Sequence, residues 1–180
     1  LGEIYYISSN RLNLGKFRQE ENALWSFAPH DISVIIALMN HQLPEKINCF
    51  GGDYLKNGIA DTTIMTMKFL NGKRAHIYVS WLNPFKEQKL TIIGSKGMLV
   101  FDDTKPWEEK LILYKDYIDT NGNKLPSPKK SKGNYIKVNE VEPLEAECKH
   151  FINCSDNRQQ PLTDGAEGLR VLKLLHSGQL

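Results

Sequence analysis

The residues best suited to acid–base chemistry lie in a mostly apolar stretch, "NALWSFAPHDISVIIALMN", which runs from Asn22 to Asn40. The apolar spacing predicts a helix over residues 23–39, and side chains three or four positions apart share one face of a helix. One narrow polar line, which we name the seam, then runs along the helix: Asn22, Ser26, His30 and Ser33. Histidine has an ordinary pKa of about 6.5, so it can move a proton at neutral pH.

Two interpretations of the seam are open. An amphipathic helix has a polar solvent edge, and the pattern alone favours this interpretation. Such an edge usually carries Lys and Glu, whereas the seam carries small neutral side chains and one imidazole. That composition suits the floor of a cleft. Asp31 lies one step round the helix and is expected to point away from His30.

The elements that must position the seam follow from the flanking sequence. A strand is expected over Glu3–Arg11 and a polar loop over Leu12–Glu21, with helices over Pro143–Cys154 and Gly165–His176. Six strand-like segments with short links follow the first helix: 45–55, 60–70, 73–82, 87–95, 97–103 and 110–118. Short links require antiparallel neighbours. The sequence therefore predicts an α+β domain with a large, open, mostly antiparallel sheet and helices on one face.

The dipeptide Asn71-Gly72 predicts a two-residue type I′ hairpin, which sets the register of its two strands. In that register one sheet face carries Met65, Met67, Phe69 and Tyr78. Helices can cover only one of the two apolar faces. We expect a second copy of the chain to cover the face with these four residues, which makes the protein a homo-oligomer.

Composition excludes several classes of protein. The chain has 180 residues and a net charge of +2, which argues against a nucleic-acid or anionic-membrane partner. The apolar run Val34–Met39 is far shorter than the roughly 20 residues of a membrane span. Three cysteines without a CxxC motif predict no disulfide framework and fit a cytoplasmic setting.

Motifs for cofactors and metals are weak. "GSKG" at residues 94–97 lies between two strand-like segments, so it is interpreted as a hairpin turn rather than a phosphate loop. No GxGxxG motif occurs, so no cofactor-binding residue is assigned. His150 and Cys154 have helical spacing, but two ligands without others nearby favour packing over a metal site. The polar segment Asp119–Asn134 is expected to be a solvated loop.

Several motifs together resemble a known family. They are "ALWSFAPHDIS", "SWLNPFKEQKLTIIGSKGMLVFDD", "EPLEAECKHFI" and "PLTDGAEGLRVLKLL". They resemble the C-terminal domain of the glucose–fructose oxidoreductase/inositol dehydrogenase/MocA (Gfo/Idh/MocA) family over nearly the whole chain. The subgroup that the chain looks most like comprises the 3-dehydrogenases of UDP-N-acetylglucosamine and of UDP-N-acetylglucosaminuronate. Because the chain starts within a strand and without methionine, residues 1–180 are expected to be one substrate-binding and oligomerisation domain excised from a longer protein.

The resemblance implies a chemistry. Family members bind NAD or NADP in an N-terminal Rossmann domain that also supplies a catalytic lysine, and this chain has neither. Their C-terminal domain often carries a D-x-x-x-H pair on the helix. The histidine corresponds to His30, which is implied to take the hydroxyl proton when a sugar is oxidised. The aspartate position is Ser26, which cannot ionise and leaves any two-residue relay in question.

The resemblance also places a pocket rim at the Leu12–Glu21 loop. Arg11 and Arg18 are expected to hold a diphosphate through bidentate hydrogen bonds. Sugar hydroxyls or a further anion would be contacted by the remaining candidates: Asn13, Asn22, Ser26 and Lys86. The alternative for each is a surface residue without a ligand.

Two other functions compete with the sugar-nucleotide enzyme. One is a dehydrogenase or ketoreductase of a free polyol or keto-sugar, with the same histidine. The other is a non-catalytic sugar-binding or scaffold module, which Ser26 favours. The sequence encoded upstream of Leu1 distinguishes enzyme from module, because only the enzyme needs a GxGxxG strand–turn–helix unit.

Overall fold

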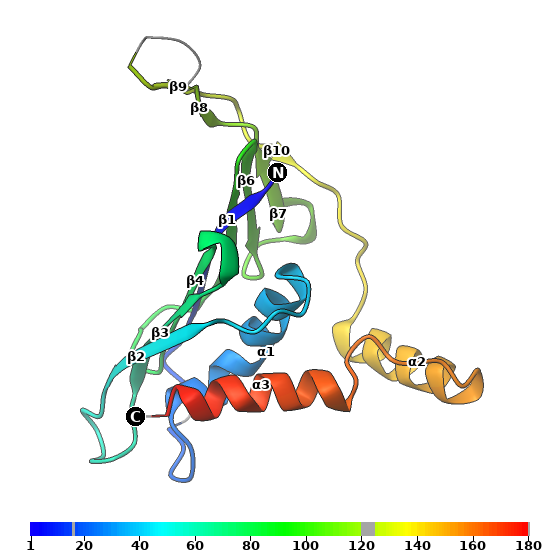
Figure 1. Ribbon diagram of the computed structural model, residues 1–180. Coiled ribbons are helices and arrows are strands. Elements are labelled where there is room, and N and C mark those ends of the chain that lie inside the picture. The colour runs from blue at the N-terminus through cyan, green and yellow to red at the C-terminus, as the bar shows by residue number, and fades with distance from the viewer. Residues whose placement is uncertain (16, 120–124, 180) are drawn as a thin grey trace.

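The computed structural model describes residues 1–15, 17–119 and 125–179 (Figure 1). Its main feature is an eight-stranded sheet in the order β10-β7-β6-β5-β1-β4-β3-β2. The strands are β1 (Ile4–Leu12), β2 (Lys46–Gly52), β3 (Thr62–Lys68), β4 (Arg74–Ser80), β5 (Glu87–Gly94), β6 (Gly97–Asp102), β7 (Leu111–Tyr114) and β10 (Asn134–Tyr135). The helices are α1 (Ala23–Leu38), α2 (Pro143–Asp156) and α3 (Gly165–Ser177). The predicted α+β class and open, mostly antiparallel sheet are confirmed.

The first strand occupies the middle of the sheet. β1 pairs in parallel with β4 and antiparallel with β5, so β4 and β5 are not neighbours although they follow each other in the chain. The other consecutive strands of the sheet from β2 to β7 pair antiparallel, as predicted. The central position of β1 brings Arg11, near its end, close to α1.

The predicted register of the β3–β4 hairpin is wrong by one residue. Residues Leu70–Gly72 form a short 3-10 turn, in which Asn71 has φ 62°, and Phe69 N donates to Lys73 O at 3.0 Å. This longer turn pairs Met65 with Ile77 instead of Tyr78. Because side chains alternate along a strand, the slip moves Tyr78 to the face opposite Met65.

The covered face is therefore the one that was expected to be open. Met65, Met67 and Phe69 are fully buried in the core that α1 and α3 form with the sheet. The prediction that the chain self-associates through these residues is wrong, because helices of the same chain cover them. The open face instead carries a row of directly paired residues, Phe50, Ile64 and Tyr78.

Two predicted segments also differ from the structure. α2 lies away from the sheet, so two helices rather than three pack on it (Figure 1). Within the expected solvated loop, β9 (Ser127–Lys129) pairs with β8 (Tyr117–Asp119) as a small separate sheet. Residues 120–124 of that loop lie outside the described residues. None of the helices in the described part of the chain is long and apolar enough to cross a membrane.

Which face is covered can be tested by two neighbouring truncations. Met65→Ala should lower the free energy of unfolding by about 2–5 kcal/mol, because it leaves a cavity in the core. Ile64→Ala should lower it by about 1 kcal/mol or less, because Ile64 is 43% exposed while Met65 is 0% exposed. Urea unfolding of both variants measures this difference. Equal costs would contradict the assignment of the two faces.

Candidate functional site

Helix α1 positions the candidate base. The Asn22 side chain caps the helix by accepting a hydrogen bond from Trp25 N at 3.1 Å. The buried side of α1 packs on the sheet through Leu24, Ala28, Ile32, Ile35 and Ile36. His30 lies on the other side of α1 and is exposed. It therefore faces outward on the helix side of the sheet, the side that α1 and α3 cover.

The two ends of the seam have structural roles. Asn22 is the cap described above, and Ser33 Oγ donates to Glu167 Oε1 of α3 at 3.1 Å. The half-buried Ser26 and the exposed His30 lie between them, and neither side chain has a hydrogen-bond partner among the described residues. Ser26 and His30 are thus the seam side chains whose polar atoms are all available to a substrate, while Asn22 uses its side-chain oxygen for the cap.

Asp31 does point away from His30, and it is the centre of a buried polar cluster. Ser9 Oγ donates to Asp31 Oδ1 at 2.7 Å, and Arg11 Nε donates to Asp31 Oδ2 at 2.8 Å. Arg11 Nη1 also reaches the Gln88 amide oxygen at 2.9 Å when that amide is oriented to accept. Most donors of Arg11 are therefore used inside the protein, which leaves it little capacity for a diphosphate.

This cluster was missed in the sequence, although a signal for it was present. The alternation of β1 places Ile7, Ser9 and Arg11 on one face. A carboxylate on the apolar side of a helix needs a partner, because an unpaired buried charge is costly. Arg11 on the same face as Ile7 was the available cation.

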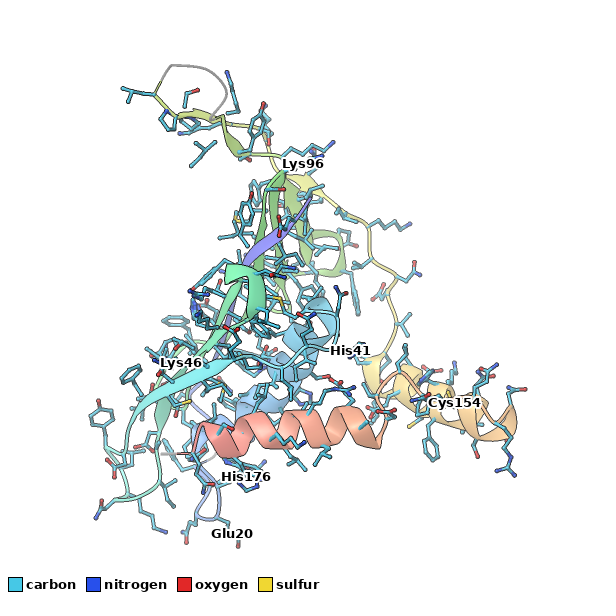
Figure 2. The ribbon with its side chains drawn as sticks, viewed as in Figure 1. Glu20, His41, Lys46, Lys96, Cys154 and His176 are labelled. Carbon is cyan, nitrogen blue, oxygen red and sulfur yellow. The ribbon has the colours of Figure 1, made fainter. Side chains whose placement is uncertain are left out.

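The other rim candidates gather at one end of the sheet. Asn13 N donates to Ser80 O at 3.1 Å, and Phe17 packs edge-on against Trp81, which holds the loop at the end of β4. Arg18 is exposed and pairs with Glu21 at 2.8 Å. Lys86 is exposed beside Glu87, which pairs with Leu12. Figure 2 shows Glu20 of this loop at the end of the molecule opposite Lys96.

His30 lies farther along α1 than this group. It lies eight positions after Asn22, which corresponds to a rise of about 12 Å along a helix. The structure therefore brings Asn13, Arg18, Asn22 and Lys86 toward one end and sets His30 apart from them. A long ligand that contacts both is compatible with this spacing.

A second buried carboxylate joins α3 to the seam. Glu167 accepts hydrogen bonds from Ser33 and from Arg170 Nη2, the latter at 2.8 Å, and lies 3.5 Å from His41 Nδ1. Burial acts to raise the pKa of Glu167, but the hydrogen bonds from Arg170 and Ser33 and the charge of Arg170 together lower it. Glu167 therefore stays ionised and fixes α3 against α1.

The described residues do not form a complete dinucleotide site. Gly94 ends β5 and Gly97 begins β6, which confirms that "GSKG" is a hairpin turn. The parallel pair among the described strands, β1 and β4, is separated by α1, β2 and β3, without a glycine-rich turn into a helix. No group of three or more His, Cys, Asp or Glu residues suited to a metal occurs within the described ranges. His150 Nε2 instead accepts from Leu162 N at 3.1 Å.

Comparison with known families agrees with this geometry. The family model described as "GFO/IDH/MocA C-terminal domain" matches residues 1–100, which is more than half of the chain. The chain belongs to this family. Members of the family are NAD(P)-dependent oxidoreductases. A comparison with curated proteins gives no match.

Solved structures share the fold at low sequence identity. UDP-N-acetylglucosamine 3-dehydrogenase GnnA from Acidithiobacillus ferrooxidans has a TM-score of 0.82 and 19% identity, over 99% of this chain and 54% of its own. The WlbA dehydrogenase from Bordetella pertussis, in complex with NADH and UDP-GlcNAcA, has a TM-score of 0.66 and 20% identity, over 98% of this chain and 51% of its own. Levoglucosan dehydrogenase, in complex with NADH and L-sorbose, has a TM-score of 0.75 and 14% identity, over 98% of this chain and 56% of its own. The Gfo/Idh/MocA chain described here thus spans about half the length of these solved relatives.

The buried ion pair gives a stability prediction. Asp31→Asn should lower the free energy of unfolding by about 3 kcal/mol, because it leaves the Arg11 guanidinium partly buried without its carboxylate. Glu21→Gln is the matched control, since it breaks the exposed pair with Arg18 and should cost less than about 1 kcal/mol. Chemical unfolding of both variants checks this. An Asp31→Asn protein as stable as the control would show that the cluster does not hold α1.

Proposed function

We propose that the protein to which this chain belongs oxidises a hydroxyl group of a sugar with NAD or NADP. The observation that carries the proposal is the exposed His30 imidazole on a helix whose other sides are fixed by buried contacts. The chain would supply the proton acceptor and the substrate contacts. The hydride acceptor would be a nicotinamide cofactor held by a separate nucleotide-binding half of the protein.

The proposed role of His30 follows from the balance of the reaction. Oxidation of a secondary alcohol removes the C–H hydrogen as hydride, and the hydroxyl proton must leave at the same carbon. A neutral imidazole can take that proton and pass it to water. Ser26 can donate or accept a hydrogen bond at this position, but it cannot carry the proton as a carboxylate would. His30 would therefore act with a group of the other half rather than with Ser26.

The proposed substrate is a nucleotide-linked N-acetyl amino sugar or its uronate. Arg18, Asn13, Asn22 and Lys86 gather at one end of the sheet, and His30 lies about 12 Å farther along α1. That separation suits a substrate whose diphosphate is held apart from the oxidised carbon. GnnA is a UDP-N-acetylglucosamine 3-dehydrogenase, and WlbA has been solved in complex with UDP-GlcNAcA. Levoglucosan dehydrogenase, bound to L-sorbose, is the observation that favours a free sugar instead.

A single substitution tests the catalytic proposal. His30→Gln in the complete protein should reduce kcat by about 10²–10⁴-fold, because the proton acceptor is lost in the transition state. The melting temperature should change little, because His30 is exposed. Steady-state kinetics with UDP-N-acetylglucosamine, its uronate and a free polyol would measure kcat and rank the substrate classes.

His176→Gln is the control for this experiment, because His176 is also an exposed histidine on the helix side and packs edge-on against Trp25. It should keep normal kcat. A fully active His30→Gln enzyme would contradict the catalytic role. A complete protein that binds sugar without turnover would favour the non-catalytic module.

We also propose that the chain self-associates through the open face of the sheet. The paired row Phe50, Ile64 and Tyr78 forms an apolar band there, with Phe50 68% exposed. Exposed apolar patches on a sheet commonly mark contacts between proteins. A second copy could cover the band from the side opposite α1 and α3.

Ile64→Asp should weaken this self-association, because it places a charge within the band. Val34→Asp is a matched control on the helix side, since Val34 is 44% exposed and Ile64 is 43% exposed. Sedimentation at micromolar concentration should show a dimer or larger species for the original chain and the control, and a shift to monomer for Ile64→Asp. A chain that is monomeric throughout would refute the open-face contact.

A further inference from the structure

Helix α2 has three distinct sides. One side is apolar and consists of Leu144, Cys148, Phe151 and Ile152, which we name the stripe. The spacing of four, seven and eight residues from Leu144 places all four on one face. The stripe is open to solvent: Leu144 is 64% exposed, Phe151 70% and Ile152 58%.

The other two sides of α2 have roles within the chain. The buried Cys154 lies on the side that meets the following segment, where His150 Nε2 accepts from Leu162 N at 3.1 Å. The opposite side is polar and carries the Glu145–Lys149 ion pair at 2.5 Å and Asn153. α2 therefore has a separate polar side that can face solvent, and the stripe is an apolar surface in addition to it.

The position of α2 leaves the stripe uncovered. Figures 1 and 2 show α2, where Cys154 is labelled, extending away from the sheet. A single helix of 14 residues is marginal in water without tertiary contacts. A helix with an anchored side, a polar side and an open apolar side has the form that docks into an apolar groove through residues at i, i+4, i+7 and i+8.

We propose that the stripe is the docking surface for the nucleotide-binding half of the same protein. This inference rests on the proposed function. Solved relatives are about twice as long as this chain, which covers 51–56% of them. The partner would be the second half of such a protein, a domain that holds a nicotinamide nucleotide and presents an apolar groove to the stripe.

The side on which α2 lies also selects this partner. α2 and α1 extend on the same side of the sheet, and the open face is on the other side (Figure 1). His30 lies on α1 and is exposed on that side. A nucleotide-binding half must approach His30, because the hydride goes to the nicotinamide and the hydroxyl proton goes to His30 from the same carbinol group. One domain approaching from there can contact both His30 and the stripe, whereas a second copy on the open face cannot.

Cys148 provides the measurement, because it lies within the stripe and is exposed. The other two thiols are slow to react: Cys154 is buried, and burial raises the pKa of Cys49 to about 11. The rate of Cys148 modification by a small aromatic disulfide at pH 8 would be compared between residues 1–180 and the full-length gene product, with the site confirmed by mass spectrometry. We expect at least about tenfold slower modification in the full-length protein, because the thiol reacts only when the interface opens.

Two substitutions make the test specific. Phe151→Asp places a charge in the stripe and should restore rapid Cys148 modification in the full-length protein. Asn153→Asp adds the same charge on the polar side, where the carboxylate can still accept from Asn157, and should leave Cys148 protected. Made in residues 1–180, both variants should have the same melting temperature as the original sequence, because neither Phe151 nor Asn153 is buried there.

Three results would overturn the proposal. They are unchanged Cys148 reactivity in the full-length protein, protection that already appears in residues 1–180 as their concentration rises, and a gene product without a nucleotide-binding half. NADH titration and turnover of the full-length protein are measured in parallel. Cys148 protection without turnover would leave the docking surface standing and reject the proposed function, whereas turnover without protection would do the reverse.

Discussion

The Asp31 carboxylate fixes the helix that carries the candidate base. It accepts hydrogen bonds from Ser9 and Arg11, both on the central strand β1, at 2.7 and 2.8 Å. A buried carboxylate with two specific donors adds a directional constraint to the apolar packing of the helix, because a rotation that leaves the charge or a donor unpaired is costly. The rotation of α1 is thereby set, and with it the outward direction of His30, its neighbour in sequence.

The sheet depends on the same region. β1 lies between β4 and β5, so the chain must leave β1, form α1, and complete β2, β3 and β4 before β4 can pair with β1. The Ser9–Asp31–Arg11 cluster joins the second element of this path to the first. Glu167 adds a second polar contact between α3 and α1, through Ser33. The buried Asp31 thus holds α1 on the sheet, and the buried Glu167 holds α3 on α1.

The surfaces left by this arrangement divide the proposed functions. The helix side carries His30 and the α2 stripe, and the open face carries the row Phe50, Ile64 and Tyr78. Cofactor supply and self-association would therefore use opposite sides and would not compete. The rim residues lie near the end of β1, where the proposed long substrate would enter.

The sequence by itself determined the elements and the family. Apolar periodicity and the "WSFAPHDIS" motif are local features, and the strands and helices they predict are present to within a few residues, except that the strand expected over 110–118 is divided into β7 and β8 of two different sheets. The exposed position of His30 and the divergence of Asp31 also follow from helical spacing alone.

Tertiary structure decided the pairing and the faces. The turn is one residue longer than the dipeptide Asn71-Gly72 predicts. Because side chains alternate between the two faces of a strand, this extra residue places Tyr78 on the face opposite Met65. The hydrogen bond between Arg11 and Asp31 joins residues 20 positions apart, and that between Ser33 and Glu167 joins residues 134 positions apart. The position of β1 between β4 and β5 likewise depends on distant segments of the chain. Local sequence patterns can name a candidate donor, as the alternation of β1 does for Arg11, but they do not decide which distant donor meets a buried carboxylate. That choice is made only when the whole chain packs.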